Sequence, residues 1–574
     1  MLNKIFAPIA TYPHCAVFMY LLGLCSLMII HHGGRHVSVF ELAVAVYLLC
    51  AFLYLLPRRL AVLAKGVVYV VAYVLAIVDM FCYFRFGEPI SASLLRLCME
   101  TDSREASEAL SEYITWEAIP SGVWLIAGVL VLHVIAARIP FKLKIDKRLF
   151  AAVLSVCFLV GLRNTVFIVR NLVEPRTAIE LEYATEWPHD GGFYLPFYRL
   201  LYAGKQMSLE SQSIEKLKKN ADAAVVDSCS FTSPDIVLII GEAYNRHHSQ
   251  LYGYDKATTP HQVALAADSS LIAFTDVVSP YHQTSMVFRM AFSLYAYGEP
   301  GDWTDYPLFP QLFRKAGYQV TFITNQFVQS LGLNNFDFSG SMFLNPPVLS
   351  RSMFDHRNVS KHKMDMALLA DYDSLKQYRT DYNLTIIHLL GQHTAYNERF
   401  TADEDVFHSG DYNRPSLSEN NLWDLGNYDN ACLYNDKVLS AILGRFEDKD
   451  AIVVFMPDHG EMVFDGDNPK FGRTLAVKTR NEVWQQFEIP FWIWSSASYR
   501  QRHPDIWDRV KAAKDLPFMT DNIDQLLLYL AGISSPDYRS KDNILSDDYD
   551  SRRKRLLMGT LDYDSMMSRP AGVR

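Results

Sequence analysis

The chain begins with long apolar segments and continues, after about residue 230, with short apolar runs separated by polar ones. Five long runs lie near residues 15–31, 38–57, 60–83, 118–138 and 149–167. Each is close to the roughly 20 residues that a helix needs to cross a bilayer. Lys4 precedes the first run as in a signal peptide, but four more runs follow and no small-residue cleavage site is evident. The pattern therefore predicts five retained transmembrane helices over residues 1–167.

Basic residues in the short connections predict the orientation of these helices. They gather at the N-terminus and in the second-to-third and fourth-to-fifth connections, as Lys4, Arg58, Arg59, Lys65, Arg138, Lys142, Lys144, Lys147 and Arg148. Residues 85–117 instead hold three basic and seven acidic residues. Because basic loops stay in the cytoplasm, we expect everything after about residue 168 to lie outside it.

A connector is expected over residues 168–232. Its segment GGFYLPFYRLLYAGKQ mixes aromatic residues with Arg199 and Lys205. This mixture favours an interfacial helix at the membrane surface, and a linker helix packed on the soluble domain is the alternative. The following SIEKLKKNADAA is typical of a solvated helix or tether.

The remainder, residues 233–574, is expected to be an α/β domain. Short apolar runs alternate there with helix-like segments, as in DIVLII (235–240), YQVTFIT (318–324), LTIIHLLG (384–391), AIVVFMPD (451–458) and IPFWIWSS (489–496). Continuous apolar runs of this length are typical of strands buried on both faces of a sheet. The sequence therefore predicts a mostly parallel central sheet.

Charge and cysteine content narrow the function. The net charge of −9 argues against nucleic acid as a partner. Of eight cysteines, only Cys229 and Cys432 lie in the soluble part, and their spacing does not establish a disulfide. No CxxC zinc pattern occurs.

Polar side chains follow three of the expected strands. Glu242 follows the first, His393 follows LTIIHLLG, and Asp458 and His459 end AIVVFMPD. Ligands of open α/β sheets collect at the carboxyl ends of strands, and carboxylate and imidazole groups suit a zinc ion. Gly460 can adopt φ values that turn the adjacent Asp458 and His459 toward one ion. A helix-capping aspartate beside a surface histidine is the alternative.

The segment FTDVVSPYHQTSMVFRMAFSL (274–294) offers a nucleophile. Thr284 stands where a helix-like stretch begins, so it is either a helix N-cap or a metal-bound alkoxide beside a helix end that attracts phosphate oxygens. The residue types leave both open. His247 and His248 are expected to be solvated loop residues, with metal binding as the alternative.

Taken in order, these motifs resemble those of the membrane-bound phosphoethanolamine transferases of Gram-negative bacteria, which belong to the alkaline phosphatase and sulfatase superfamily. The matching segments are DIVLIIGEAYNRHHSQLYGYDKATTP, VVSPYHQTSMVFRMAFS, HLLGQHTAYNERF, NYDNACLYNDKVL, MPDHGE and MTDN. The resemblance implies a sulfatase-like fold and a zinc ion held by Glu242, Thr284, Asp458 and His459. It also makes Thr284 the nucleophile.

The resemblance assigns the substrate residues too, with departures. It makes His393 a catalytic or phosphate-binding residue and places Asn325 near the substrate. The lipid A enzymes of the family carry several disulfides and a histidine about a dozen residues after the metal histidine. Here that stretch is KFGRT, with Phe471 in the histidine's place and Arg473 to supply positive charge. The segments HLLGQHTAYNERF and TRNEVWQQFEIPF are more similar to the branch that modifies phosphorylated heptose of the lipopolysaccharide core.

The resemblance implies an inner-membrane enzyme with its catalytic domain in the periplasm. It would transfer phosphoethanolamine from phosphatidylethanolamine to a core heptose phosphate or a lipid A phosphate, through a phosphoethanolamine-threonine intermediate. A glycerophosphate-type headgroup transferase, a metal-dependent sulfatase or phosphodiesterase, and a non-catalytic membrane anchor are the alternatives. We expect a monomer.

Overall fold

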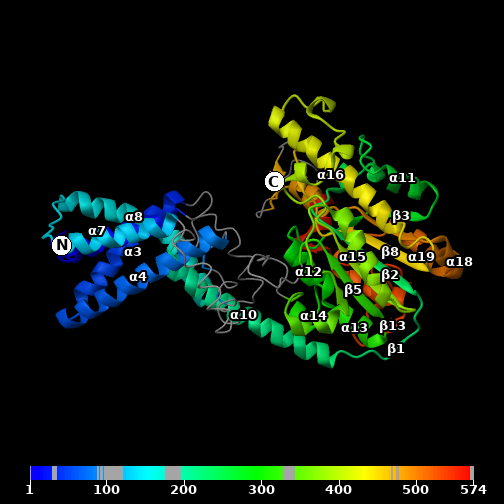
Figure 1. Cartoon of the computed structure of the whole chain (residues 1–574), viewed down its shortest axis with the longest axis horizontal. Helices are drawn as coiled ribbons and strands as arrows, with labels where there is room; N and C mark the ends of the chain where they lie inside the picture. The colour runs from blue at the N-terminus through cyan, green and yellow to red at the C-terminus, as the bar shows by residue number, and fades with distance from the viewer. Residues whose placement is uncertain are drawn as a thin grey trace. The chain divides into compact units, whose positions relative to one another are not determined.

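In the computed structural model, the described residues are 2–28, 35–86, 89–90, 95, 121–174, 195–327, 343–466, 470–473 and 477–568. They form two compact units, residues 1–212 and 213–574. Figure 1 shows the elements of both. The predicted domain boundaries at 167/168 and 232/233 stay predictions.

Six described helices precede the connector in unit 1; all but α1 lie at the five predicted positions. They are α1 (Leu2–Thr11), α2 (Pro13–Leu27), α3 (Arg35–Leu55), α4 (Arg58–Phe86), α7 (Ser121–Ala136) and α8 (Lys147–Val173). Proline at the first position of α2 and the Asp146 side chain at the start of α8 fix two of the helix beginnings, since Asp146 accepts from the N–H groups of Arg148 and Leu149.

The described residues do not confirm the predicted number of membrane spans. Among the described residues, Ser38–Leu55 and Arg58–Phe84 are long and apolar enough to cross a bilayer. Two bent pairs raise the number to four if each is one span: Leu2–Thr11 with Pro13–Leu27, bent by 75°, and Lys147–Leu162 with Thr165–Val173, bent by 44°. The apolar helical domain is confirmed, whereas five spans are not, because α2 has only 15 residues and the described part of α7 only 16.

The connector contains one long helix, α10 (Pro196–Ala223). It joins the aromatic segment and the charged segment without a break, although their compositions predicted two elements. Within unit 1, the Arg199 guanidinium forms a buried ion pair with Asp79 of α4, with Nε 3.0 Å from Oδ1. The position of α10 at a membrane surface stays a prediction.

Unit 2 is an α/β domain around a seven-stranded sheet in the order β3-β11-β8-β2-β7-β5-β6. The strands are β2 (Asp235–Gly241), β3 (Leu271–Phe274), β5 (Gln319–Thr324), β6 (His356–Arg357), β7 (Asn383–His388), β8 (Ala451–Pro457) and β11 (Phe491–Ser495). All five predicted strands are present. The part β8-β2-β7-β5-β6 is parallel, as expected, but β11 pairs antiparallel with both β8 and β3, so the sheet is mixed.

Helices surround this sheet (Figure 1). They are α11 (Pro260–Ala267), α12 (Thr284–Phe292), α13 (Phe309–Ala316), α14 (Pro347–Met353), α15 (Leu368–Leu375), α16 (Glu419–Leu443), α17 (Arg480–Phe487), α18 (Ala497–Arg502), α19 (Pro504–Ala513), α20 (Ile523–Ala531) and α21 (Tyr563–Ser568). The core on one face joins Val237, Val453 and Phe455 of the sheet to Leu439 and Ile442 of α16. The burial of whole strands explains their continuous apolar runs.

Short two-stranded ladders complete unit 2. They use β1 (Ser228–Cys229), β4 (Val277–Val278), β9 (Met462–Val463), β10 (Phe471–Gly472), β12 (Phe518–Met519), β13 (Ile533–Ser534), β14 (Leu556–Leu557) and β15 (Leu561–Asp562). Cys229 lies in β1 and Cys432 in α16, and both thiols are free, so the candidate disulfide between them is not formed.

Candidate metal centre and active site

Two adjacent strands bring the predicted ligands together. β2 and β8 pair in parallel with Gly241 opposite Pro457, and the Asp458 N–H donates to the Gly241 carbonyl at 3.0 Å. The next residues, Glu242 and Asp458, therefore lie side by side at the carboxyl edge of the sheet. Ligand atoms of Glu242, Asp458 and His459 all lie within 4.8 Å of one another, and the three residues are fully buried. The strand-end argument therefore located this cluster correctly.

The turn after β2 is strained and held in place by α16. Ala243 has a φ of +53°, in the left-handed region that residues other than glycine seldom adopt. Its N–H donates to Asp458 Oδ1 at 3.0 Å, and the Tyr428 hydroxyl of α16 donates to its carbonyl at 2.7 Å. These bonds direct Glu242 back toward β8.

Two glycines permit close backbone approaches at the site. Gly391 has a φ of +49°, and a Cβ there would lie 2.9 Å from the Glu242 nitrogen, so glycine lets the loop after β7 reach the cluster. A Cβ on Gly460 would lie 2.2 Å from the Gln485 carbonyl oxygen. Gly460 does not have a positive φ. The prediction that this position needs glycine for its φ value is therefore wrong. Glycine is needed here because the backbone packs closely against α17.

The imidazole of His459 presents a lone pair to the carboxylates. Its Nδ1 lies 2.8 Å from the Gly460 carbonyl, which can only accept a hydrogen bond, so Nδ1 carries the proton. Nε2 then faces Asp458 Oδ2 at 3.2 Å and Glu242 Oε1 at 3.5 Å. Asp458 Oδ2 is buried and has no hydrogen-bond partner among the residues that the structure describes. Three acceptor atoms thus converge in a buried space, which fits a divalent cation.

The carboxylates cannot share this space as two anions without a cation. Burial raises the pKa of Glu242, but His459, His393 and Arg473 lower it to about 2. Burial and the neighbouring Glu242 hold the pKa of Asp458 well above its ordinary range. Without a cation, Glu242 therefore keeps its charge and Asp458 takes a proton.

Thr284 points its hydroxyl into this cluster. It is the first residue of α12, whose N-cap is Gln283, so the N-cap alternative is wrong. Its Oγ1 lies 3.1 Å from Glu242 Oε2 and 3.4 Å from His459 Nε2. A hydroxyl at a helix N-terminus beside a cluster that could hold a cation is suited to attack on phosphorus, because the helix end favours phosphate oxygens.

Arg473 also lies at the cluster, and its predicted contact with the substrate stays a prediction. Its Nη1 donates to His459 Nε2 at 3.0 Å, and its Nε lies 3.7 Å from Glu461 Oε2. Burial raises the pKa of Glu461 to about 7. Neither carboxylate oxygen of Glu461 has a hydrogen-bond partner within the described part of the chain. The sequence analysis gave Glu461 no role, although it stands in the MPDHGE segment.

The other two predicted substrate residues differ in their surroundings. His393 is half-buried on the loop after β7, where Thr394 Oγ1 lies 3.2 Å from its Nδ1. Asn325 is buried, donates to Asp365 Oδ1 at 2.8 Å and accepts from the His362 N–H at 2.6 Å, so it fastens a neighbouring loop. Substrate contact by either residue stays a prediction.

Gln326, which the sequence analysis missed, contacts a predicted metal ligand. Its Nε2 donates to Glu242 Oε2 at 3.0 Å and to the Leu389 carbonyl at 2.9 Å, and it lies 3.2 Å from His388 Nε2. Burial lowers the pKa of His388 to about 3, so the imidazole beside this amide is neutral. Gln326 stands in the same ITNQ segment as Asn325, for which the resemblance implies a place near the substrate.

His248 is buried, so the expectation of a solvated loop histidine is wrong for it. Its Nδ1 lies 2.6 Å from Asp429 Oδ1 and its Nε2 2.9 Å from Asp465 Oδ2. Burial lowers the pKa of His248, but the two carboxylates raise it to about 10. An imidazolium between two carboxylates has no lone pair for a metal, so this network is structural and ties the loop after β2 to α16.

The chain is similar to a known family and to solved enzymes. The model of the sulfatase family matches residues 234–523, just over half of the chain. Phosphoethanolamine transferase EptC of Escherichia coli K12 is 28% identical over 468 residues, 79% of this chain and 77% of that protein. Phosphoethanolamine transferase CptA of Salmonella typhimurium is 27% identical over the same length.

A solved structure is similar to unit 2. The C-terminal periplasmic domain of EptC from Escherichia coli, in complex with Zn, matches with a TM-score of 0.51 and 26% identity, covering 61% of this chain and 98% of that one. The chain therefore belongs to the sulfatase family, and its relatives there are the phosphoethanolamine transferases that its motifs resemble.

Proposed function

We propose that this chain transfers phosphoethanolamine from phosphatidylethanolamine to a lipopolysaccharide phosphate through a covalent phosphoethanolamine-threonine intermediate, with Zn²⁺ as cofactor. The observation that carries the proposal is the position of the Thr284 hydroxyl, 3.1 Å from Glu242 in a buried cluster with Asp458 and His459. The likeness to phosphoethanolamine transferases over 79% of the chain supports the transferred group.

Glu242, Asp458, His459 and Thr284 would hold the cation. The donor set favours Zn²⁺, and the Zn complex of the similar periplasmic domain supports that choice. When bound, Zn²⁺ would lower the pKa of the Thr284 hydroxyl and neutralise charge on phosphoryl oxygens. The Gln326 amide and the Gly460 carbonyl orient Glu242 and His459 for this task.

In the first step, Thr284 Oγ1 attacks the phosphorus of the donor. The Thr284 hydroxyl gives up its proton to water, the Oγ1–P bond forms, the bond from phosphorus to the glycerol oxygen breaks, and diacylglycerol leaves with a proton that His393 supplies. Arg473 holds the phosphoryl oxygens, whose charge is stabilised by preorganised donors. The helix N-terminus of α12 adds to this field.

In the second step, an oxygen of the acceptor attacks the same phosphorus. The Oγ1–P bond breaks, the acceptor carries one phosphoethanolamine unit, and Thr284 and His393 regain their protons from water and from any proton that the acceptor oxygen loses. We place the acceptor in the lipopolysaccharide core or on lipid A. EptC and CptA, at 28% and 27% identity, favour their branch over the Kdo(2)-lipid A phosphoethanolamine 7''-transferase of Escherichia coli K12, which is 24% identical over 314 residues.

The apolar helices of unit 1 support placement in the bacterial inner membrane, with five spans and unit 2 in the periplasm. The basic connections support this orientation. A membrane-embedded unit also brings the enzyme to a bilayer that contains its phospholipid donor.

Intact-mass measurement of the purified full chain tests the covalent step. The protein incubated with phosphatidylethanolamine should gain one phosphoethanolamine, and Thr284→Ala should not. Ser285→Ala, which removes the neighbouring hydroxyl of the same helix, should retain the adduct. An adduct on Thr284→Ala would overturn the assignment. Mass spectrometry of lipid A and core oligosaccharide from cells with either variant then identifies the acceptor.

A further inference from the structure

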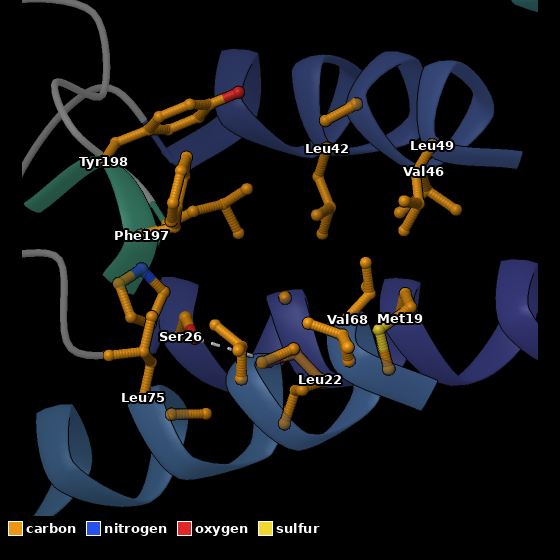
Figure 2. A pocket seen from close by; sticks show the side chains of 18 residues that line it. Met19, Leu22, Ser26, Leu42, Val46, Leu49, Val68, Leu75, Phe197 and Tyr198 are labelled. Carbon is orange, nitrogen blue, oxygen red and sulfur yellow. Dashed lines mark hydrogen bonds between the residues drawn. The ribbon is translucent and has the colours of Figure 1, made fainter. Parts of the chain in front are cut away.

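Unit 1 contains a cavity of about 440 Å³. It lies between α2, α3, α4 and the first residues of α10. Figure 2 shows Leu42, Val46 and Leu49 of α3 on one side of the space, facing Val68 and Leu75 of α4. The volume is within the range of about 300–1,000 Å³ that small-molecule sites occupy.

The lining selects for an apolar ligand. Aliphatic side chains form most of it, together with Phe197. The hydroxyl of Ser26 donates to the Leu22 carbonyl of its own helix, so it is already engaged. A polar ligand would lose hydrogen bonds to water on entering this space and would find few replacements.

The cavity reaches the outer surface of α4. Val67 and Val71 both line it, yet 55% and 43% of their surfaces are exposed. They belong to an exposed apolar face that also includes Val70 and Val74. On a membrane-spanning helix such a face contacts acyl chains, so a ligand can enter from the hydrocarbon core without passing through water.

The shape is elongated. The lining residues run along α4 from Val67 to Ala76, about 14 Å at 1.5 Å per residue. At one end the cavity meets Phe197 and Tyr198, and the next residue, Arg199, forms its buried ion pair with Asp79. The long direction is therefore apolar, and the polar groups are confined to one end.

We propose that this cavity binds one acyl chain of a membrane phospholipid, which enters beside the exposed face of α4. This inference rests on the membrane placement of unit 1 and is independent of the transfer chemistry. The acyl chain belongs either to the phosphatidylethanolamine donor or to any phospholipid of the bilayer.

Photocrosslinking of the full chain in vesicles tests the proposal. One set of vesicles contains phosphatidylethanolamine with a diazirine in its acyl chain, and the other contains phosphatidylglycerol with the same chain. Adducts are mapped by peptide mass spectrometry. Leu42 is the reporter, because it lines the cavity but is only 1% exposed, so bulk lipid cannot label it from outside.

Two variants fill the cavity from opposite sides, Ala72→Phe from α4 and Ala45→Phe from α3. Each should reduce labelling of Leu42 at least fivefold. Val74→Phe adds the same ring on the exposed face of α4, outside the lining, and should leave the labelling unchanged. Circular dichroism and the thermal midpoint identify a variant that has lost its fold, and the other filling variant then decides.

Labelling from phosphatidylethanolamine alone would assign the cavity to the donor, and labelling from both lipids would assign it to bilayer phospholipid in general. The proposal would be overturned if both filling variants fold and still show full labelling of Leu42. It would also be overturned if the wild type were labelled at exposed residues of α4 but not at Leu42. Thr284→Ala should label like the wild type. Failure of the proposed transfer reaction therefore leaves this result unaffected.

Discussion

Gln326→Met tests whether the side chain behind Glu242 determines how well the site binds zinc. Methionine has nearly the same length as glutamine but lacks the amide. The substitution removes the donor to Glu242 Oε2 at 3.0 Å and the donor to the Leu389 carbonyl at 2.9 Å. Because the group is buried, no water replaces the lost bonds.

The magnitude follows from the charge on the acceptor. A hydrogen bond to a charged group contributes about 1.5–3 kcal/mol. If the substitution removes this stabilisation only from the Glu242 orientation that binds zinc, zinc affinity should fall about 10–100-fold. This is the range seen when groups that orient metal ligands are removed. Competition with a chromophoric zinc chelator measures the Kd on purified protein without any activity assay.

Gln311→Met is the matched control. Gln311 is also buried and hydrogen-bonded, accepting from the Leu308 N–H and donating to Ser352, but these partners lie outside the site. Both variants should lose thermal stability, and only Gln326→Met should lose zinc affinity. A Kd for Gln326→Met within about twofold of the wild type, or an equal loss in Gln311→Met, would refute the reasoning.

Three further predictions follow. His248→Gln should cost about 3–5 kcal/mol, since it breaks a buried ion pair. The pKa of His248 in the folded protein, about 10, lies above its ordinary value of about 6.5, so the wild type should lose stability as the pH rises between these values. Thermal melts of His248→Gln should lack that decline, and those of the surface control His408→Gln should keep it. Zinc at 1,000 times its Kd should stabilise the folded wild type by about 4 kcal/mol, and Asp458→Asn should show no such rise in melting temperature; an equal rise in both would contradict the site. Arg473→Met should bind zinc no more weakly than the wild type, because the wild-type guanidinium competes with the metal for His459 Nε2, which lies 3.0 Å from Arg473 Nη1. Transfer should slow about 10²–10³-fold, because the variant loses a contact with the phosphoryl group. Weaker zinc binding with unchanged transfer would contradict this role.

The sequence predicted those parts of the fold that depend on hydrophobic burial. The run AIVVFMPD gave both a central strand and the ligands at its end, because the length of a buried run and the position of its end are local properties. The direction of a strand is not local, so the antiparallel pairing of β11 could not be derived from IPFWIWSS. The sequence also could not establish the number of membrane spans, because helix ends depend on packing as well as on hydropathy.

The candidate site shows the same division. Glu242, Asp458 and His459 were predictable because each follows a strand end. The environments of Gln326 and His248 were not, because their partners are distant in sequence: Glu242 is 84 residues from Gln326, and Asp429 is 181 residues from His248. A polar residue in a loop looks solvated until the fold supplies the groups that bury it.

The charges of the site explain why its parts depend on one another. Glu242, Asp458 and Glu461 are three buried carboxylates, and Arg473 is the cation in contact with the cluster. Without a metal the sum is negative. Burial, reinforced by the charge of Glu242, holds the pKa of Asp458 well above its ordinary range and raises that of Glu461 to about 7. A divalent cation would bring the sum of these charges to zero with every carboxylate ionised.

Arg473, released from His459 Nε2 when a metal takes that lone pair, would then be available for the negative charge that an incoming phosphoryl group adds. Arg473 therefore fits both the metal-free site and a site that holds metal and substrate.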